Sequence, residues 1–227
     1  MKQNPTILLT GANGQVGFEL RRSLAFSGHL IALDRQQCDL ANIEQLRQVI
    51  RKNKPNVIVN AAAYTAVDKA ESDSANAQRI NAEAVAAMAE EAAVCEATVI
   101  HYSTDYVFDG EKQGFYNESD LTNPLGIYGS SKLAGEQALQ AAVPHYVLRT
   151  SWVYGAHGNN FLKTMMRLAR QKEALSVVAD QWGAPTGAAL IADVTAALVQ
   201  QLQMGKNIDL LLEKVLLEAD MMELKAN

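Results

Sequence analysis

The chain has 227 residues, a formal net charge of −5 and a sequence pI of about 5.4. Hydrophobic residues make up 48% and charged residues 20%, which is typical of a soluble globular domain. The acidic balance disfavours a nucleic-acid-binding surface, because neutralising several phosphates requires a basic face. The two cysteines and four histidines show no metal-ligand spacing, so no metal site is predicted.

The sequence also gives no sign of a membrane segment. No run approaches the roughly 18 apolar residues of a membrane span, and the N-terminus lacks the apolar core of a secretory signal. With only two widely spaced cysteines, the default expectation is a reducing, cytoplasmic setting.

Short apolar runs alternate with helical patterns along the chain. The predicted strands are residues 6–10, 30–34, 56–62, 97–104, 145–151 and 175–180. The predicted helices are residues 15–27, 42–53, 81–94 and 128–142, and Asn42 can cap the second of them. Runs that are apolar throughout are typical of parallel strands covered on both faces. The order predicts an α/β fold, a doubly wound parallel sheet of Rossmann type with its ligand crevice at the carboxyl ends of the strands.

Glycines follow the first predicted strand. In TGANGQVG, residues Gly11, Gly14 and Gly17 have G-x-x-G-x-x-G spacing, which allows a tight turn and a close approach of backbone to a pyrophosphate. Asp34 ends the second strand, where a carboxylate can bind the ribose of an adenosine. Arg35 follows at once and can accommodate a 2′-phosphate, so NADH and NADPH both remain open.

More suitable residues follow the second, third and fourth strands. Asp39 and Leu40 follow the second strand, where they can flank an adenine. NAAAYT at 60–65 places small residues where a flat dinucleotide needs space, and HYSTDYVFDG at 101–110 places polar side chains after the fourth strand. Each feature alone could be an ordinary turn or cap. Because all lie at strand ends that meet in one crevice, together they favour a dinucleotide site.

Tyr128 and Lys132 stand four residues apart in a predicted helix, so their side chains share one face. An ammonium about 4 Å from a phenol is worth on the order of 4 kcal/mol at an effective dielectric near 20. That energy would lower the tyrosine pKa from about 10 to near neutrality. The pair alone is weak evidence, because such a spacing also arises by chance, but the energy is about sufficient for Lys132 to make Tyr128 a usable acid.

These motifs carry a family resemblance. TGANGQVG, NAAAYT, STDYVF and YGSSK resemble the extended short-chain dehydrogenases/reductases. More narrowly, the chain is similar over about residues 6–205 to the dTDP-4-dehydrorhamnose reductase family, through NAAAYTAVDKAES, HYSTDYVFDG, PL-x-x-YG-x-x-KLAGE, RTSWVYG, GNNF and DQWGAPTG. The resemblance implies reduction of the 4-keto group of dTDP-4-dehydro-L-rhamnose by NADPH or NADH.

The resemblance also implies roles for individual residues. The catalytic residues would be Thr104, Tyr128 and Lys132. Those beside the dTDP-linked sugar would be Thr104, Asp105, Tyr106 and Trp152. The dinucleotide would contact Gly11, Gly14, Gln15, Val16, Gly17, Asp34, Asp39, Leu40, Ala62, Ala63, Tyr64, Thr65 and Lys132.

Domain boundaries follow from where the resemblance fades. Residues 1–207 are expected to form an NAD(P)-binding Rossmann-type domain, with 152–207 carrying part of the substrate side. Because the family normally continues further, an incomplete C-terminal substrate lobe is expected. Apolar residues at helical spacing predict a divergent helical tail over 208–227. This tail could cover sheet surface or form a subunit contact in a homodimer, and both alternatives stay open.

Two other functions use the same fold. A nucleotide-sugar dehydratase generally needs an Asp-Glu pair after the threonine, and Asp105-Tyr106 lacks the glutamate. A non-catalytic, dinucleotide-binding regulatory or partner protein stays open as the alternative to a reductase.

Overall fold

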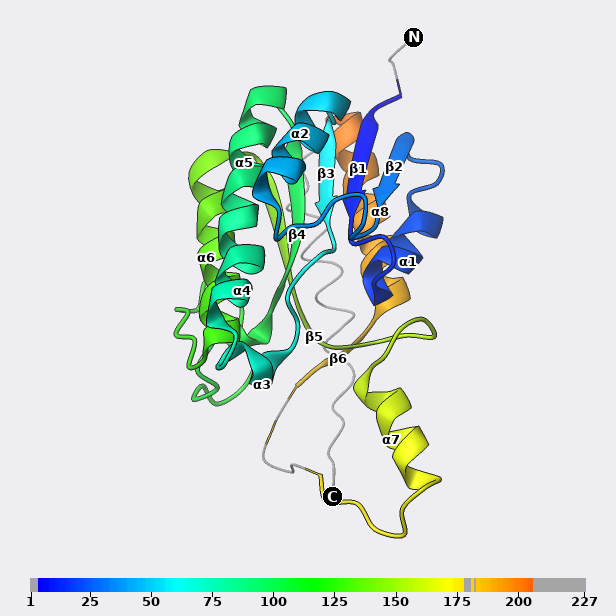
Figure 1. Cartoon of the computed structure of the whole chain (residues 1–227), viewed down its shortest axis with the longest axis vertical. Coiled ribbons are helices and arrows are strands. Elements are labelled where there is room, and N and C mark those ends of the chain that lie inside the picture. The colour runs from blue at the N-terminus through cyan, green and yellow to red at the C-terminus, as the bar shows by residue number, and fades with distance from the viewer. Residues whose placement is uncertain (1–3, 178–180, 182, 206–227) are drawn as a thin grey trace.

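The computed structural model describes residues 4–177, 181 and 183–205. Their strands form one six-stranded sheet in which all neighbouring pairs are parallel (Figure 1). The strands are β1 (Thr6–Thr10), β2 (His29–Leu33), β3 (Val57–Asn60), β4 (Thr98–Thr104), β5 (His145–Tyr154) and β6 (Pro185–Gly187). Their order, β2-β1-β3-β4-β5-β6, reverses direction between β1 and β3. This is the switch point at which doubly wound sheets bind ligands.

Helices cover both faces of the sheet (Figure 1). One face carries α1 (Gln15–Ser23) and α8 (Ala188–Met204), which contact each other. The other carries α2 (Ile43–Asn53), α5 (Ala84–Cys95) and α6 (Ile127–Ala142). The shorter elements are α3 (Val67–Ala70), α4 (Ser74–Gln78), α7 (Phe161–Ala169), a π-helical turn (Arg79–Glu83) and a 3-10 turn (Asp105–Val107). The predicted doubly wound α/β fold is confirmed.

Two apolar cores explain why the strand sequences are apolar throughout. Successive strand residues point to opposite faces. Leu8 of β1 therefore packs in the core under α2 and α5, whereas Ile7 and Leu9 pack in the core under α1 and α8. All three are fully buried. At about 1.5–3 kcal/mol for each buried aliphatic side chain, the sheet is a stable frame for the loops at its edge.

The first five predicted strands and the four predicted helices are confirmed, with ends shifted by a few residues. Asn42 caps α2 as predicted, since its side chain accepts a hydrogen bond from the backbone N–H of Gln45. The sixth predicted strand is wrong: residues 175–177 are not in a strand, and 178–180 lie outside the described residues. The sheet is instead completed by Pro185–Gly187, which pairs with β5 across a register shift. The sequence PTG carries no apolar signal by which a strand could be predicted.

The predicted tail at 208–227 lies outside the described residues. Among the residues that are described, no helix is long and apolar enough to cross a membrane. The same part of the chain contains no group of acidic, histidine or cysteine side chains arranged to hold a metal ion.

Candidate active site

The glycine-rich loop after β1 packs too tightly for side chains. Gly11 has a φ of +70°, and a Cβ built on it would lie 2.7 Å from backbone atoms of Ala61 and Ala62. A Cβ on Gly17 would lie 2.0 Å from the carbonyl oxygen of Gly11. The loop thus rests on the segment that follows β3 and on the first turns of α1. Backbone N–H groups at a helix start beside such a loop suit a pyrophosphate.

An open cavity of about 680 Å³ extends from this loop past the end of β2. Asp34 is one of the residues that line it. Its Oδ1 accepts the backbone N–H groups of Gln36 and Gln37 at 2.9 and 3.1 Å, and its Oδ2 accepts the side-chain amide of Asn13 at 3.2 Å. The lining residues are Asn13, Asp34, Arg35, Gln36, Asp39, Asn42 and Gln45. The cavity therefore joins carboxylates, amides and one guanidinium at the predicted adenosine end.

Arg35 and Asp39 face each other in this cavity, with Nε of Arg35 3.5 Å from Oδ1 of Asp39. The Arg35 side chain is 79% exposed, so it is free to turn toward a phosphate. Leu40 lies elsewhere: it is 3% exposed and packs in the core with residues such as Leu46 and Ile58. Leu40 does not line the cavity, and its contact with an adenine stays a prediction.

The other residues predicted to hold the dinucleotide differ in their surroundings. The Oε1 of Gln15 accepts the side-chain amide of Asn160 at 3.0 Å. Val16 and Ala62 pack against the two cores, whereas Ala63 and Thr65 are exposed.

Tyr64 is held at both ends. Its backbone N–H donates to Oδ1 of Asn81 at 2.9 Å, and its hydroxyl donates to Oδ2 of Asp73 at 3.1 Å. Burial, followed by the Asp73 hydrogen bond, raises the pKa of Tyr64. The segment after β3 is thereby tied to the π-helical turn and to α4.

Thr104, Asp105 and Tyr128 meet at the carboxyl end of β4. The Thr104 hydroxyl donates to Oδ1 of Asp105 at 3.0 Å and accepts the backbone N–H of Tyr106 at 3.2 Å. Tyr128, in the first turn of α6, has its ring edge-on to Tyr106 with centroids 5.6 Å apart. Burial raises the pKa of Tyr128 to about 12, hydrogen bonding with Thr104 acts to lower it, and the charge of Asp105 raises it. The Tyr128 hydroxyl therefore keeps its proton at neutral pH.

Lys132 lies one helical turn after Tyr128 but directs its amine to β4. Its Nζ donates to the carbonyl oxygen of Tyr102 at 2.6 Å and lies 3.1 Å from Nε2 of His101. The residue is 2% exposed, and burial lowers its pKa to about 8 against the opposing charge of Glu136.

Burial raises the pKa of Tyr128 and Lys132 is not among the groups that shift it, so the role of Lys132 as activator of Tyr128 stays a prediction. Spacing by four residues brings Cβ atoms together, but it does not decide where a four-carbon side chain ends.

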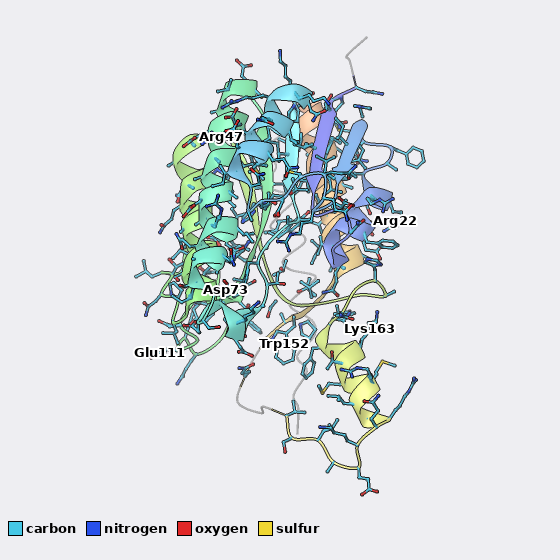
Figure 2. The ribbon with its side chains drawn as sticks, viewed as in Figure 1. Arg22, Arg47, Asp73, Glu111, Trp152 and Lys163 are labelled. Atoms are coloured by element: carbon cyan, nitrogen blue, oxygen red, sulfur yellow. The ribbon has the colours of Figure 1, made fainter. Side chains whose placement is uncertain are left out.

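The residues predicted to face the sugar gather at the ends of β4 and β5. Oδ2 of Asp105 accepts the hydroxyl of Ser151 at 2.5 Å, which links the two strands. Trp152 follows with a φ of +45°, a conformation that is costly for a bulky residue, and it is 41% exposed. Its ring centroid lies 5.5 Å from that of Phe161, the first residue of α7. Figure 2 shows Trp152, near the C-terminal end of β5, on the side of α7.

Comparisons with known proteins match this site to a family. The sequence profile of the RmlD substrate binding domain matches residues 5–212. The dTDP-4-dehydrorhamnose reductase of Salmonella typhimurium is 55% identical over 199 residues, which cover 86% of this chain and 67% of the relative. The chain belongs to the dTDP-4-dehydrorhamnose reductase family. The reductase of Escherichia coli K12 is 53% identical with the same coverage.

Solved structures of dTDP-4-dehydrorhamnose reductases agree with this family. One from Clostridium acetobutylicum has a TM-score of 0.82 and 40% identity, covering 86% of this chain and 70% of that chain. Another, from Bacillus anthracis in complex with NADP, has a TM-score of 0.83 and 39% identity. It covers 87% of this chain and 71% of that chain. The resemblance predicted from the motifs is confirmed.

Sequence reasoning missed several polar residues that the structure places in this reductase-family site. Asn13 lines the cavity beside Asp34, and Ser151 binds Asp105. Asn60 and His101 lie deeper, buried in β3 and β4. The latter two left a signal in the sequence, because each is a polar residue within or ending a strand that is otherwise largely apolar.

Proposed function

We propose that the chain reduces the 4-keto group of dTDP-4-dehydro-L-rhamnose to dTDP-L-rhamnose, with NADPH or NADH as hydride donor. The observation that carries the proposal is the meeting of Thr104, Tyr128 and Asp105 at the strand ends in a member of this reductase family. The relatives named above carry this enzyme's name.

The dinucleotide side of the chain fits such a cofactor. The loop with Gly11, Gly14 and Gly17 packs closely before the start of α1, whose backbone N–H groups suit a pyrophosphate, and the Asp34 cavity is open to an adenosine ribose. We assign the same binding surface to Gln15, Val16, Asp39 and Leu40 and to the 62–65 segment. The bound nicotinamide supplies the hydride.

Tyr128 supplies the proton. Reduction of the ketone adds a hydride to carbon and a proton to oxygen, and the Tyr128 hydroxyl is protonated at neutral pH because its pKa is about 12. Thr104 is proposed to orient the Tyr128 hydroxyl by hydrogen bonding, which acts to lower the Tyr128 pKa, while Asp105 holds Thr104 in place. Lys132 is proposed to bind the nicotinamide ribose and to restrain the Tyr128 phenolate when its amine is charged.

The sugar side is assigned to Thr104, Asp105, Tyr106 and Trp152. Tyr106 and Trp152 are each 41% exposed, and exposed aromatic rings at a strand end suit a sugar face or a base. In this proposal residues 1–207 form the NAD(P)-binding domain, and 152–207 contribute to the sugar side.

Asp34 and Arg35 lead us to expect use of both cofactors. The carboxylate favours a ribose hydroxyl and repels a 2′-phosphate, while the exposed guanidinium of Arg35 attracts it. Dissociation constants for NADH and NADPH, measured by nicotinamide fluorescence, should differ by less than about a hundredfold, which corresponds to roughly 2.7 kcal/mol. A larger preference for either would show that one of the two side chains dominates.

The direct test is turnover. The purified chain, NADPH and dTDP-4-dehydro-L-rhamnose should consume the reduced nicotinamide absorbance and form dTDP-L-rhamnose, with Tyr128→Phe as the matched control. Saturable dinucleotide binding without turnover would identify a binding protein and reject the reductase.

A further inference from the structure

A row of four buried polar side chains crosses the sheet beneath the candidate site. Thr10 of β1, Asn60 of β3, His101 of β4 and Lys132 of α6 are each at most 2% exposed. Thr10 Oγ1 lies 2.7 Å from Asn60 Oδ1, Asn60 Nδ2 lies 3.0 Å from His101 Nδ1, and His101 Nε2 lies 3.1 Å from Lys132 Nζ. The catalytic proposal above uses only Lys132, so the other three need a separate explanation.

The hydrogen-bond directions in this row follow from one backbone group. The N–H of Ala62 can only donate, and its acceptor is Oδ1 of Asn60 at 3.3 Å. The Nδ2 of Asn60 consequently faces His101 and donates to Nδ1. A neutral imidazole that accepts at Nδ1 carries its proton on Nε2. That proton points at Lys132.

Only an uncharged Lys132 can accept this proton, because an ammonium has no lone pair. A charged Lys132 must instead donate to Nε2, which moves the imidazole proton to Nδ1. Asn60 must then turn its amide so that Oδ1 accepts from Nδ1 and Nδ2 donates to Thr10, which gives up the bond from the Ala62 N–H. The two arrangements differ by one proton taken from solvent, and the imidazole is neutral in both.

We propose that His101 is a positioning residue whose tautomer depends on the charge of Lys132 and is held by Asn60. The imidazole proton lies on Nε2 when the Lys132 amine is neutral and on Nδ1 when it is an ammonium. The neutral-amine arrangement keeps every hydrogen bond of the row, whereas the ammonium arrangement pairs both imidazole nitrogens at the expense of the bond from the Ala62 N–H to Asn60. Its catalytic meaning, control of the charge that can restrain the Tyr128 phenolate, rests on the proposed function. The tautomer change itself does not.

The charged and titratable groups around Lys132 are compatible with this behaviour. Helix α6 itself contributes Tyr128 and Glu136, and Arg149 of β5 binds Glu136. The neighbouring elements also contribute His101 of β4 and Asp105 of the 3-10 turn. Burial, and then the Lys132 charge, lower the pKa of His101 well below its ordinary value, so an imidazolium is disfavoured. Burial also lowers the pKa of Lys132, to about 8, which brings its charge change into an accessible range.

The test is a ¹⁵N NMR titration of the histidine side chains in the chain without ligands, from about pH 6 to about pH 10. The His101 signals are identified by their loss in His101→Gln. We expect Nε2–H at high pH and Nδ1–H at low pH, with a midpoint near 8 and no imidazolium. One unchanged tautomer over the whole range, or conversion to imidazolium, would overturn the proposal.

Asn60→Asp is the matched variant. A carboxylate can only accept from His101, so Nδ1–H is expected at every pH, and Nε2 is then a permanent acceptor for the Lys132 ammonium. If this variant retains the wild-type titration, Asn60 does not hold the tautomer and the proposal fails. Because neither measurement involves substrate, failure of the proposed reductase activity would leave both results interpretable. Circular dichroism confirms that the variant is folded, and the wild-type titration decides the question if it is not.

Discussion

The strands β1 and β3 near the glycine loop and the β5 side of the sheet differ in how firmly they are built. On the dinucleotide side, β1 and β3 are almost wholly buried, and the glycine loop has backbone atoms packed against backbone atoms. On the sugar side, β5 is only partly buried, none of the α7 residues is buried, and Trp152 has a positive φ. A close-packed frame holds the part of the site that must fit an invariant dinucleotide, while the sugar end offers exposed aromatic side chains. We therefore expect cofactor binding to be the more robust property of the chain.

The two sides are joined at the glycine loop. The ring of His157, in the loop after β5, stacks on Phe18 with centroids 4.1 Å apart, and its Nε2 lies 3.0 Å from the carbonyl oxygen of Asn13. Asn160 donates to Gln15 nearby. The position of the sugar-side loop is therefore linked to the loop that we assign to the pyrophosphate.

The largest effect expected is that of Tyr128→Phe on turnover. The ring is retained and only the proton donor is lost, so kcat should fall by about 10²–10⁴-fold. The dinucleotide dissociation constant, measured by nicotinamide fluorescence, should change less than about twofold. Equal loss of binding and turnover would mean that the dinucleotide side and the sugar side cannot be separated in this way.

The second effect concerns the buried amine of Lys132. Its pKa is about 8 in the folded chain, against an ordinary value of 10.5. Between these values the unfolded chain binds more protons than the folded chain, so stability rises with pH there. Lys132 should contribute on the order of 3 kcal/mol to this rise. Chemical denaturation at several pH values should show the rise in the wild type and its absence in Lys132→Met.

Dinucleotide affinity should fall in the variant, because the proposed ribose ligand is gone.

A matched pair of glycine substitutions measures the close packing of the dinucleotide side. Gly11 and Gly110 have similar φ values, +70° and +80°, but a Cβ on Gly110 would meet nothing within 4 Å. Gly110→Ala should cost only the backbone strain, about 1–2 kcal/mol. Gly11→Ala adds a clash with the backbone of Ala61 and Ala62, so it should cost about 2 kcal/mol more. Urea denaturation gives both values, and equal losses would show that the loop can relax.

The smallest effect on stability is expected on the sugar side. Trp152→Asn exchanges a strained, half-exposed ring for a residue that tolerates positive φ. Relief of strain and loss of the contact with Phe161 should nearly cancel, leaving a change below about 1 kcal/mol in the free energy of unfolding. The KM for the sugar nucleotide should nevertheless rise, by roughly tenfold or more. An unchanged KM would remove Trp152 from the proposed sugar site.

The architecture and the family could both be predicted from the order of residues alone. Strands β1 to β5 are mostly apolar because each is covered on both faces, and the helices between them begin and end at residues such as Asn42 and Pro55 that act locally. The glycine spacing and the polar strand ends depend on local geometry too. For this reason Gly11, Gly17, Asp34 and Thr104 could be singled out before any packing was known.

How those residues act on one another depended on the packing of the whole fold. Strand β6 is defined by its pairing with β5, since Pro185–Gly187 has no strand-forming pattern of its own. The partner of Lys132 is likewise set by β4, which brings His101 and the Tyr102 carbonyl to its amine, whereas spacing along α6 pointed to Tyr128. Leu40 became a core residue because α2 and β3 close over it. Contacts between residues far apart in the chain depend on how elements pack, and a periodicity within one element cannot specify them.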